Sequence, residues 1–173
     1  MMFDYLKYSA YKRNSSVMTD MQQAFLNRYL STLNDTERAT IPQINAEHFC
    51  ADEWNANTCA SLINAGIKTA SCSLRAGYAI EQEPDPVVGQ LTVVLDWQQQ
   101  PVCIIKVIRI EYCQFKDVTP EFAALEGEGD RSYASWRSSH QAFFSQDAHE
   151  LGISFDEESE LILEYFTKIF PES

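Results

Sequence analysis

The sequence lacks long hydrophobic runs and is poor in glycine and proline. It contains no stretch of about 18 consecutive apolar residues, the length that a membrane-spanning helix needs. Six glycines and six prolines among 173 residues are too few for a fibrous or low-complexity protein. The first 16 residues, MMFDYLKYSAYKRNSS, lack the apolar core of a secretory signal. We therefore expect a cytoplasmic protein without a membrane partner.

The sequence also lacks the spacings of common metal sites. Its cysteines form no CxxC pair and are odd in number, which argues against both a zinc knuckle and a disulfide framework. Its three histidines form no HExxH or HxH motif. We therefore expect no metal and no other cofactor, and we expect most cysteines to be buried thiols. The cysteines are Cys50, Cys59, Cys72, Cys103 and Cys113.

Positive charge is scarce. The 13 Lys and Arg residues stand against 25 Asp and Glu residues, which gives a net charge of −12. This balance disfavours a protein that holds nucleic acid mainly by neutralising phosphates. Residues 1–116 carry 12 acids and 10 bases (−2), whereas residues 117–173 carry 13 acids and 3 bases (−10). The nearly neutral first part still leaves room for a local basic patch of Lys68, Arg75, Lys106 and Arg109.

An apolar content of 45% in 173 residues is enough for one hydrophobic core and one compact domain. Apolar residues at helical spacing and residues typical of helix caps predict helices over 20–33, 52–65 and 119–126. They also predict a fourth helix that starts at Asp130 or Ser132 and runs to about Glu150. Short segments rich in β-branched residues predict strands over 67–74, 91–97 and 102–112, the last two joined as a hairpin. The segment 160–170 fits either a helix or a strand by pattern. The class predicted from these elements is α+β.

Three polar residues occupy unusual places in these elements. Lys68 follows the Gly66 turn between a helix and a strand, Ser71 comes three residues later, and Glu126 ends a helix before EGEGD. Each also has a simpler structural interpretation, as a solvated lysine, a strand serine that bonds backbone, and an exposed glutamate. Position alone therefore does not establish a site.

The combination of motifs is more specific. The segment AGIKTAS (65–71), the block EGEGDRS (126–132) and the segment WRSSH (136–140) follow each other in this order. This pattern resembles the ASCH family of PUA-like domains over about residues 48–170. The resemblance implies a small, mostly antiparallel PUA-like β-barrel with flanking helices and an extra N-terminal helix, in which 160–170 is a strand. Together with the N-terminal pattern, which shows no period over residues 1–18 and a helix after Thr19, this predicts a loosely ordered tail (1–18), a helical extension (19–45) and the ASCH domain (46–173).

The resemblance also implies a function in RNA metabolism. Small bacterial members of the family are amidohydrolases that remove the acetyl group of N4-acetylcytidine with a Lys, a Thr three residues later and a Glu. These residues correspond to Lys68, Ser71 and Glu126, so we expect a metal-independent hydrolase of a modified pyrimidine nucleoside. Serine keeps the hydroxyl of the family threonine but loses the methyl group that restricts its rotamer. The alternatives are an RNA-binding protein or a ribonuclease acting on single-stranded RNA, as another bacterial member is, and a non-catalytic sensor.

The chemistry leaves two roles open for Lys68. It can take the proton of a Ser71 nucleophile if burial lowers its pKa, or it can remain charged and stabilise an oxyanion if Glu126 keeps it protonated.

A small nucleoside or RNA partner also needs planar groups for stacking and donors for the base carbonyl. The candidate substrate-binding residues are Arg75, Arg131, Tyr133, Trp136 and His140. The sequence leaves the oligomeric state open.

Overall fold

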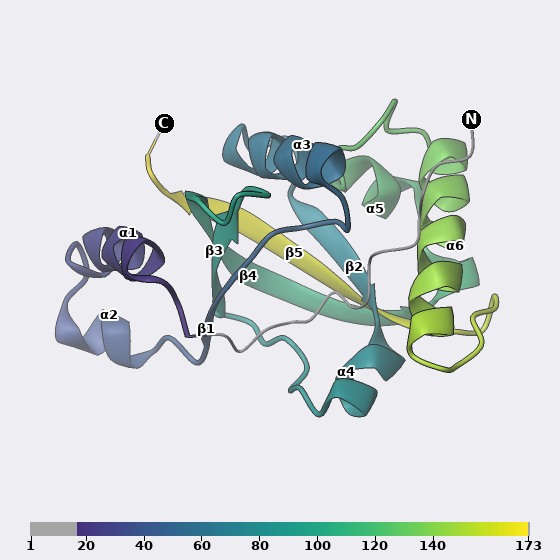
Figure 1. Cartoon of the computed structure of the whole chain (residues 1–173), viewed down its shortest axis with the longest axis horizontal. Helices are drawn as coiled ribbons and strands as arrows, with labels where there is room; N and C mark the ends of the chain where they lie inside the picture. The colour runs from purple at the N-terminus through teal and green to yellow at the C-terminus, as the bar shows by residue number, and fades with distance from the viewer. Residues whose placement is uncertain (1–16, 173) are drawn as a thin grey trace.

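The computed structural model describes residues 17–172 and shows five strands in one mixed sheet, in the order β1-β3-β4-β5-β2 (Figure 1). β1 runs parallel to β3, and the other ladders are antiparallel. The α+β class and the mostly antiparallel sheet are therefore confirmed. Within residues 17–172 no ladder joins β1 to β2, so the barrel is open on that side. The strands are β1 Ile44–Glu47, β2 Ala70–Leu74, β3 Leu91–Leu95, β4 Pro101–Gln114 and β5 Glu160–Phe170.

Six α-helices and one short 3-10 helix surround this sheet in the described residues. The four predicted helices are present as α1, α3, α5 and α6, each within a few residues of its expected ends. Two short helices, α2 and α4, were not predicted because neither carries a long apolar period. The helices are α1 Asp20–Leu30, α2 Asp35–Ala39, α3 Glu53–Asn64, α4 Arg75–Glu81, α5 Pro120–Leu125 and α6 Tyr133–Glu150, and the 3-10 helix η1 is Phe115–Asp117. None of them is long and apolar enough to cross a membrane.

The first helix begins at the predicted capping box. The Thr19 hydroxyl accepts from the backbone N–H of Gln22, whose side chain returns the bond to the Thr19 backbone. The helix ends at Leu30, three residues before the predicted end, because Ser31 caps it and the chain turns toward α2. Leu26 is buried against β3 and β4, so α1 covers one face of the sheet. The predicted tail, residues 1–18, lies outside the described residues except for its last two.

The opposite face of the sheet packs against α3. Ala60 and Ile63 of α3 form one buried cluster with Val94 of β3, Ile105 of β4 and Phe166 of β5. A third cluster joins β2 and β5 to α5 and α6, which stand at the end of the sheet away from α1 (Figure 1). The sheet is therefore covered by different helices at its two ends.

The C-terminal segment is a strand, as the resemblance implied. β5 pairs with β4 on one side and with β2 on the other, which makes it interior to the sheet. Leu161, Ile162 and Leu163 are consecutive buried residues, because both faces of β5 are covered. A strand buried on both faces loses the alternation of apolar and polar residues. This explains why the pattern alone left the segment open.

The segment before β2 differs from the prediction. The strand begins at Ala70 and not at Ile67, since the N–H groups of Ile67 and Lys68 both bond to the Leu62 carbonyl and close the end of α3. The next N–H group, that of Thr69, donates to the Leu125 carbonyl of α5 at 2.9 Å. Lys68 is thus fixed between the end of α3 and the end of α5.

Candidate functional site

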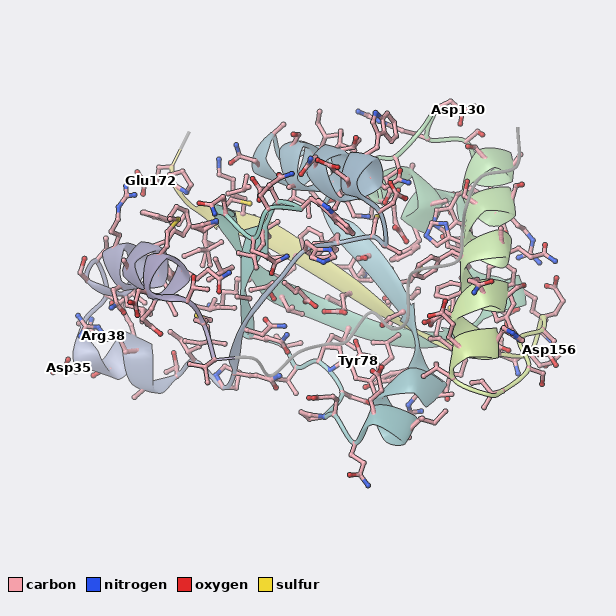
Figure 2. The ribbon with its side chains drawn as sticks, viewed as in Figure 1. Asp35, Arg38, Tyr78, Asp130, Asp156 and Glu172 are labelled. Carbon is pink, nitrogen blue, oxygen red and sulfur yellow. The ribbon has the colours of Figure 1, made fainter. Side chains whose placement is uncertain are left out.

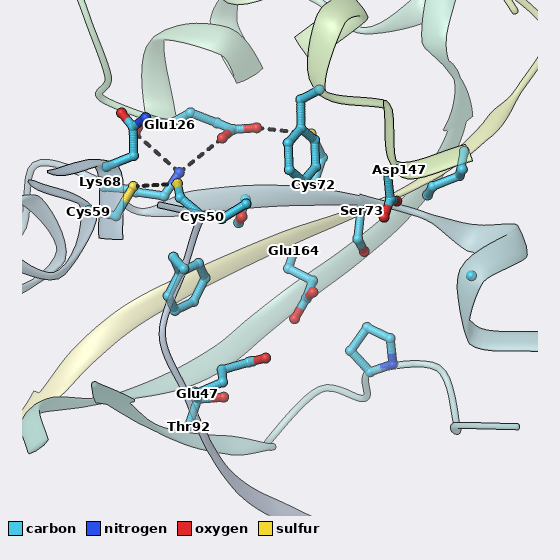
Figure 3. Close-up of a pocket in the computed structure, with 18 of the residues that line it drawn as sticks. Glu47, Cys50, Cys59, Lys68, Cys72, Ser73, Thr92, Glu126, Asp147 and Glu164 are labelled. Carbon is cyan, nitrogen blue, oxygen red and sulfur yellow. Dashed lines mark hydrogen bonds and ion pairs between the residues drawn. The ribbon is translucent and has the colours of Figure 1, made fainter. Parts of the chain in front are cut away.

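A cavity of about 1620 Å³ lies on the α3 side of the sheet and extends to α6 (Figure 3). Its floor includes Thr92 of β3, Ile105 of β4, Glu164 and Phe166 of β5, and Ser71 of β2. Strand alternation places these side chains on the same face, because they share the face of the buried α3 cluster. The loop before α3 and most of the length of α6 form the walls.

Lys68 and Glu126 meet at one end of this cavity. The Lys68 Nζ atom donates to Glu126 Oε2 at 2.9 Å and to Glu128 Oε1 at 2.7 Å. Only 2% of Lys68 and 2% of Glu126 is exposed, whereas the Glu128 side chain is 34% exposed toward the cavity. The sequence separation of 58 residues between Lys68 and Glu126 is closed by the backbone contact between the ends of α3 and α5.

The charges around Lys68 determine its protonation state. Burial alone lowers the pKa of Lys68, but the adjacent Glu126 and Glu128 carboxylates outweigh burial and hold this pKa well above the usual 10.5. Lys68 is therefore an ammonium at neutral pH. Of the two roles left open by the sequence, the geometry favours charge stabilisation over proton abstraction.

Glu126 is the centre of a buried polar network. It is the C-cap residue of α5, and its Oε1 atom accepts from Cys72 Sγ at 3.0 Å and from Trp136 Nε1 at 3.2 Å, while His140 Nε2 lies 3.4 Å away. Burial raises the pKa of Glu126, but Lys68 and His140 more than offset this and keep the pKa far below the usual 4.5. Glu126 is thus ionised at every physiological pH.

Ser71 lies apart from this network. Its side chain is half-buried and lines the same cavity, but from the face of β2 opposite to Cys72, the neighbour that contacts Glu126. Among the hydrogen bonds of residues 17–172, none joins the Ser71 hydroxyl to Lys68 or Glu126. Across the β2–β5 ladder Ser71 is paired with Glu164, which therefore lies on the same face.

Two of the predicted substrate-binding residues line the cavity. Trp136 and His140 are one turn apart on α6, and their rings stack with centroids 4.3 Å apart. Tyr133 also stacks with Trp136, with ring centroids 6.1 Å apart, and does not line the cavity. Trp136 is 94% buried, and the N–H at the edge of its ring donates to Glu126.

The two predicted arginines are elsewhere. Arg75 is exposed at the start of α4, where it pairs with Glu160 at 2.9 Å and lies over the Tyr112 ring. Arg131 is exposed in the loop before α6, and its neighbour Asp130 is at the outer edge of the molecule (Figure 2). Neither arginine lines the cavity.

The suggested basic patch is also not formed. Lys68 is buried and neutralised, so it contributes no positive surface. Arg109 lies 3.7 Å above the Tyr165 ring and pairs with Glu111, and Arg75 is engaged by acids as described. The spacing of these residues gave no information on their burial, which is why the sequence overestimated the patch.

Sequence reasoning missed Glu128 and Cys72. Glu128 is the second acid of the EGEGDRS block, two residues after Glu126, and this position could have pointed to it. Cys72 was treated as one of the buried thiols, but strand alternation on β2 would have separated it from Ser71. Side chains on the sheet such as Glu47 and Glu164 had no signal in the sequence, because β1 was not predicted and β5 was ambiguous.

The cavity is strongly acidic. Among the described residues that line it there are ten carboxylates and one lysine, and that lysine is already paired with two of the acids. Figure 3 shows Glu47 and Glu164 reaching into the cavity from the sheet. The acidic residues are Glu47, Asp52, Glu53, Glu81, Glu83, Glu126, Glu128, Asp147, Glu150 and Glu164.

Two groups of side chains contain enough potential ligands for a cation. Ligand atoms of Cys72, Glu126 and His140 lie within 4.8 Å of one another, and those of Cys50, Cys59 and Glu128 do so as well. Each group contains one of the two carboxylates that bind the Lys68 ammonium. A dication in either group would therefore stand beside a buried positive charge, which is unfavourable.

Comparison with known proteins supports the fold. The chain resembles the ASCH domain from Lactobacillus crispatus JV V101, with 45% identity, a TM-score of 0.84 and coverage of 89% of this chain and 97% of that one. It also resembles a protein from Enterococcus faecalis V583, with 26% identity, a TM-score of 0.73 and coverage of 85% and 86%. Comparison with curated proteins gives no match.

These similarities confirm the PUA-like fold class that the motifs implied. The family model described as the ASCH domain matches residues 45–170, which is most of the chain and includes Lys68, Ser71 and Glu126. The chain therefore belongs to the ASCH family.

Proposed function

We propose that this protein is a metal-independent amidohydrolase that removes the acyl group from the N4 nitrogen of a modified pyrimidine nucleoside such as N4-acetylcytidine. The observation that carries the proposal is the buried Lys68 ammonium, held by Glu126 and Glu128 at the end of a cavity large enough for a nucleoside. Lysine is rarely buried, and its desolvation here is balanced by two carboxylates. Such a fixed charge is suited to a developing oxyanion.

In this proposal Lys68 binds the acyl oxygen and stabilises its negative charge when the amide is attacked. The more exposed Glu128 yields one of the Lys68 donors to the substrate, while the buried Glu126 retains the other. Glu126 is itself fixed by Trp136 and Cys72, so it holds the lysine in place and does not need to move. Lys68 is thus an electrostatic catalyst and not a base.

The nucleophile in this proposal is the Ser71 hydroxyl on the cavity floor. Because Lys68 is protonated, the proton of Ser71 needs another acceptor. Glu164 pairs with Ser71 across the β2–β5 ladder, and directly opposed residues in such a ladder have Cβ atoms about 5 Å apart. We assign Glu164 as the base that accepts this proton and returns it to the departing amine, which leaves the acyl group as an ester on Ser71. A water molecule that loses its proton to the same carboxylate then cleaves this ester, releases the carboxylic acid and restores the Ser71 hydroxyl.

The acidic lining supports a small ligand over RNA. A nucleoside carries no phosphate, whereas each phosphate of an RNA strand would be repelled by the carboxylates of the cavity. This argument weighs against the alternative of an RNA-binding protein or a ribonuclease acting on single-stranded RNA.

The direct test is an assay of N4-acetylcytidine hydrolysis that measures the release of cytidine and acetate. Ser71→Ala should abolish turnover, because a nucleophile loses its function with its oxygen, and Ser71→Thr should retain it. Glu164→Gln should lower kcat with a smaller effect on KM, since a base acts in the transition state. Ser73→Ala is the matched control, because Ser73 lines the same cavity two residues further along β2.

Variants of Lys68 must distinguish an effect on catalysis from an effect on the stability of the fold. Lys68→Met leaves the buried Glu126 charge without its main partner and should cost about 3–5 kcal/mol of stability, so loss of activity alone is not informative. Lys68→Arg keeps the charge and should keep the fold but lose most turnover, because its fork places the donors differently. Full kcat in Ser71→Ala would overturn the nucleophile, and the absence of hydrolysis by the folded wild type would overturn the substrate class.

A further inference from the structure

A pair of thiols stands in the cavity wall next to Lys68, and the proposed hydrolysis does not use it. The Sγ atoms of Cys50 and Cys59 are 3.1 Å apart and share a hydrogen bond (Figure 3). Cys59 belongs to α3 and is 99% buried, whereas Cys50 lies in the loop between β1 and α3 and is half-buried. No other pair of cysteines in residues 17–172 forms a hydrogen bond.

The backbone of Cys50 has an unusual conformation. Cys50 has φ = 69°, in the left-handed region that non-glycine residues rarely adopt. Such conformations persist only where the surroundings enforce them, and they gather at functional sites. The loop that carries Cys50 contributes Phe49, Ala51 and Asp52 to the lining of the cavity.

The pair is also coupled to the candidate site. Both sulfur atoms and a carboxylate oxygen of Glu128 lie within 4.8 Å of one another, and the Glu128 carboxylate is bonded to Lys68. A change in the bonding of the two sulfurs therefore acts on a group that touches the Lys68 ammonium.

We infer that Cys50 and Cys59 form a reversible disulfide when the protein meets a peroxide, and that this bond fixes the loop 48–52 to α3 in the wall of the cavity. The sulfurs need to approach from 3.1 Å to about 2.05 Å, a shift that a loop residue can provide. The inference rests on the thiol geometry and does not depend on the proposed hydrolase function.

The reaction balances with a hydroperoxide as the oxidant. The Cys50 thiolate attacks the O–O bond and becomes a sulfenic acid, and the alkoxide or hydroxide that leaves takes up a proton. Cys59 Sγ then attacks the Cys50 sulfur, and the expelled hydroxide leaves as water with the Cys59 proton. The two thiols lose two electrons in total, and the peroxide gains them.

The roles of the two cysteines follow from their surroundings. The hydrogen bond to Cys50, together with burial, raises the pKa of the Cys59 thiol well above 9.0, so Cys59 stays protonated. Cys50 is the more exposed sulfur and is the one that an oxidant in the cavity reaches first. Cys59 is then in place to resolve the sulfenic acid.

A metal ion is the competing interpretation of the same residues, and the geometry favours the disulfide. Two sulfurs bound to one zinc at about 2.3 Å in a tetrahedron lie about 3.8 Å apart, which is wider than the observed 3.1 Å. The third ligand, Glu128, is already bonded to the Lys68 ammonium, which would repel a dication.

The test is peroxide treatment of the native full-length protein, followed by thiol counting and digestion without reductant. Two of the five thiols should be lost and should return with dithiothreitol. Cleavage after Glu53 separates Cys50 from Cys59, so the two peptides should remain joined only in the oxidised wild type. Cys50→Ser and Cys59→Ala should each abolish the joined peptide, whereas Cys113→Ser, a half-buried cysteine with no thiol partner among the described residues, should leave it unchanged.

Three outcomes would overturn the inference. They are a disulfide between another pair of cysteines, formation of the Cys50–Cys59 bond only after denaturation, and protection of both thiols by stoichiometric zinc in the presence of reductant. The readouts are covalent bonds and thiol counts, so they hold whether or not the protein hydrolyses a nucleoside.

Discussion

At the scale of single residues, the decisive feature is a carboxylate that is ionised although it is buried. Glu126 gains Lys68 as its counter-ion and three further contacts from Cys72, Trp136 and His140, which come from two other elements. Removing any one of these partners leaves part of the desolvation of Glu126 uncompensated. We therefore regard the network as the structure that keeps Lys68 in place.

His140 gives this network a measurable dependence on pH. Burial lowers the pKa of His140, but the Glu126 carboxylate outweighs burial, and the net pKa is raised from 6.5. A group whose pKa is raised by folding contributes stability that is complete below its unfolded pKa and is lost as pH rises through its folded pKa. The wild type should thus lose stability as pH rises above about 6.5.

The measurement is the free energy of unfolding in urea across neutral pH. His140→Gln should remove this decline, so that the difference between wild type and variant shrinks as pH rises. His149→Gln, an exposed histidine at the end of the same helix, is the control and should preserve the decline. An unchanged pH profile in His140→Gln would show that Glu126 does not interact with His140 in solution.

At the scale of elements, the site depends on how the end of α3 meets the end of α5. Gly127 follows Glu126 with φ = +71°, and a Cβ atom at this position would lie 2.8 Å from the Ile67 carbonyl oxygen. The residues on either side of this contact are Lys68 and Glu126. The close approach of the two backbones, which only glycine permits, therefore sets the distance within the ion pair.

Gly127→Ala should separate the two segments. The left-handed conformation costs an alanine roughly 1–2 kcal/mol, and the overlap with the carbonyl adds roughly 1–3 kcal/mol. Gly66→Ala is the matched control, because Gly66 has the same φ of +71° but no atom within 4 Å of the place that a Cβ would occupy, so only the first cost applies. Urea unfolding measures both, and equal losses in the two variants would contradict the role of the close contact.

The elements were largely predictable from the sequence, and the gaps have physical causes. The Thr19 capping box and the Pro120 start of α5 are local signals, and both helices begin where these signals are. β1 and α4 are short and are stabilised by the sheet and by neighbouring loops, so no local sequence pattern predicts them. The strand β5 needed the family resemblance, because burial on both faces removed its alternation.

The candidate site was predictable only in part. The contact between Lys68 and Glu126 was expected from the family motifs, and the structure has it. The remaining geometry depends on side-chain direction, which places Ser71 on one face of β2 and Cys72 on the other. The burial of Lys68 and the exposure of Arg131 are properties of packing that residue spacing does not contain.

At the scale of the whole molecule, the fold brings acids from both parts of the chain together in the cavity. Residues 117–173 carry 13 acids and 3 bases, and five of the ten carboxylates that line the cavity come from this part of the chain. They are at the C-cap of α5, in the loop between α5 and α6, on α6 and on β5. The other five come from residues 1–116, so both parts of the chain contribute equally to the negative charge of the cavity.

This distribution predicts how binding responds to salt. An RNA held through its phosphates releases counter-ions, and its affinity falls steeply between about 50 and 200 mM salt, whereas a neutral nucleoside displaces none. N4-acetylcytidine should thus bind with nearly constant affinity over this range, measured by calorimetry, and single-stranded RNA should bind weakly throughout. Glu47→Gln should leave the nucleoside salt profile flat and improve RNA binding at low salt, while Asp35→Asn on the remote helix α2 should change neither (Figure 2). Tight RNA binding by the wild type with a steep negative salt slope would instead place the RNA on a surface outside this cavity and would favour the RNA-binding alternative.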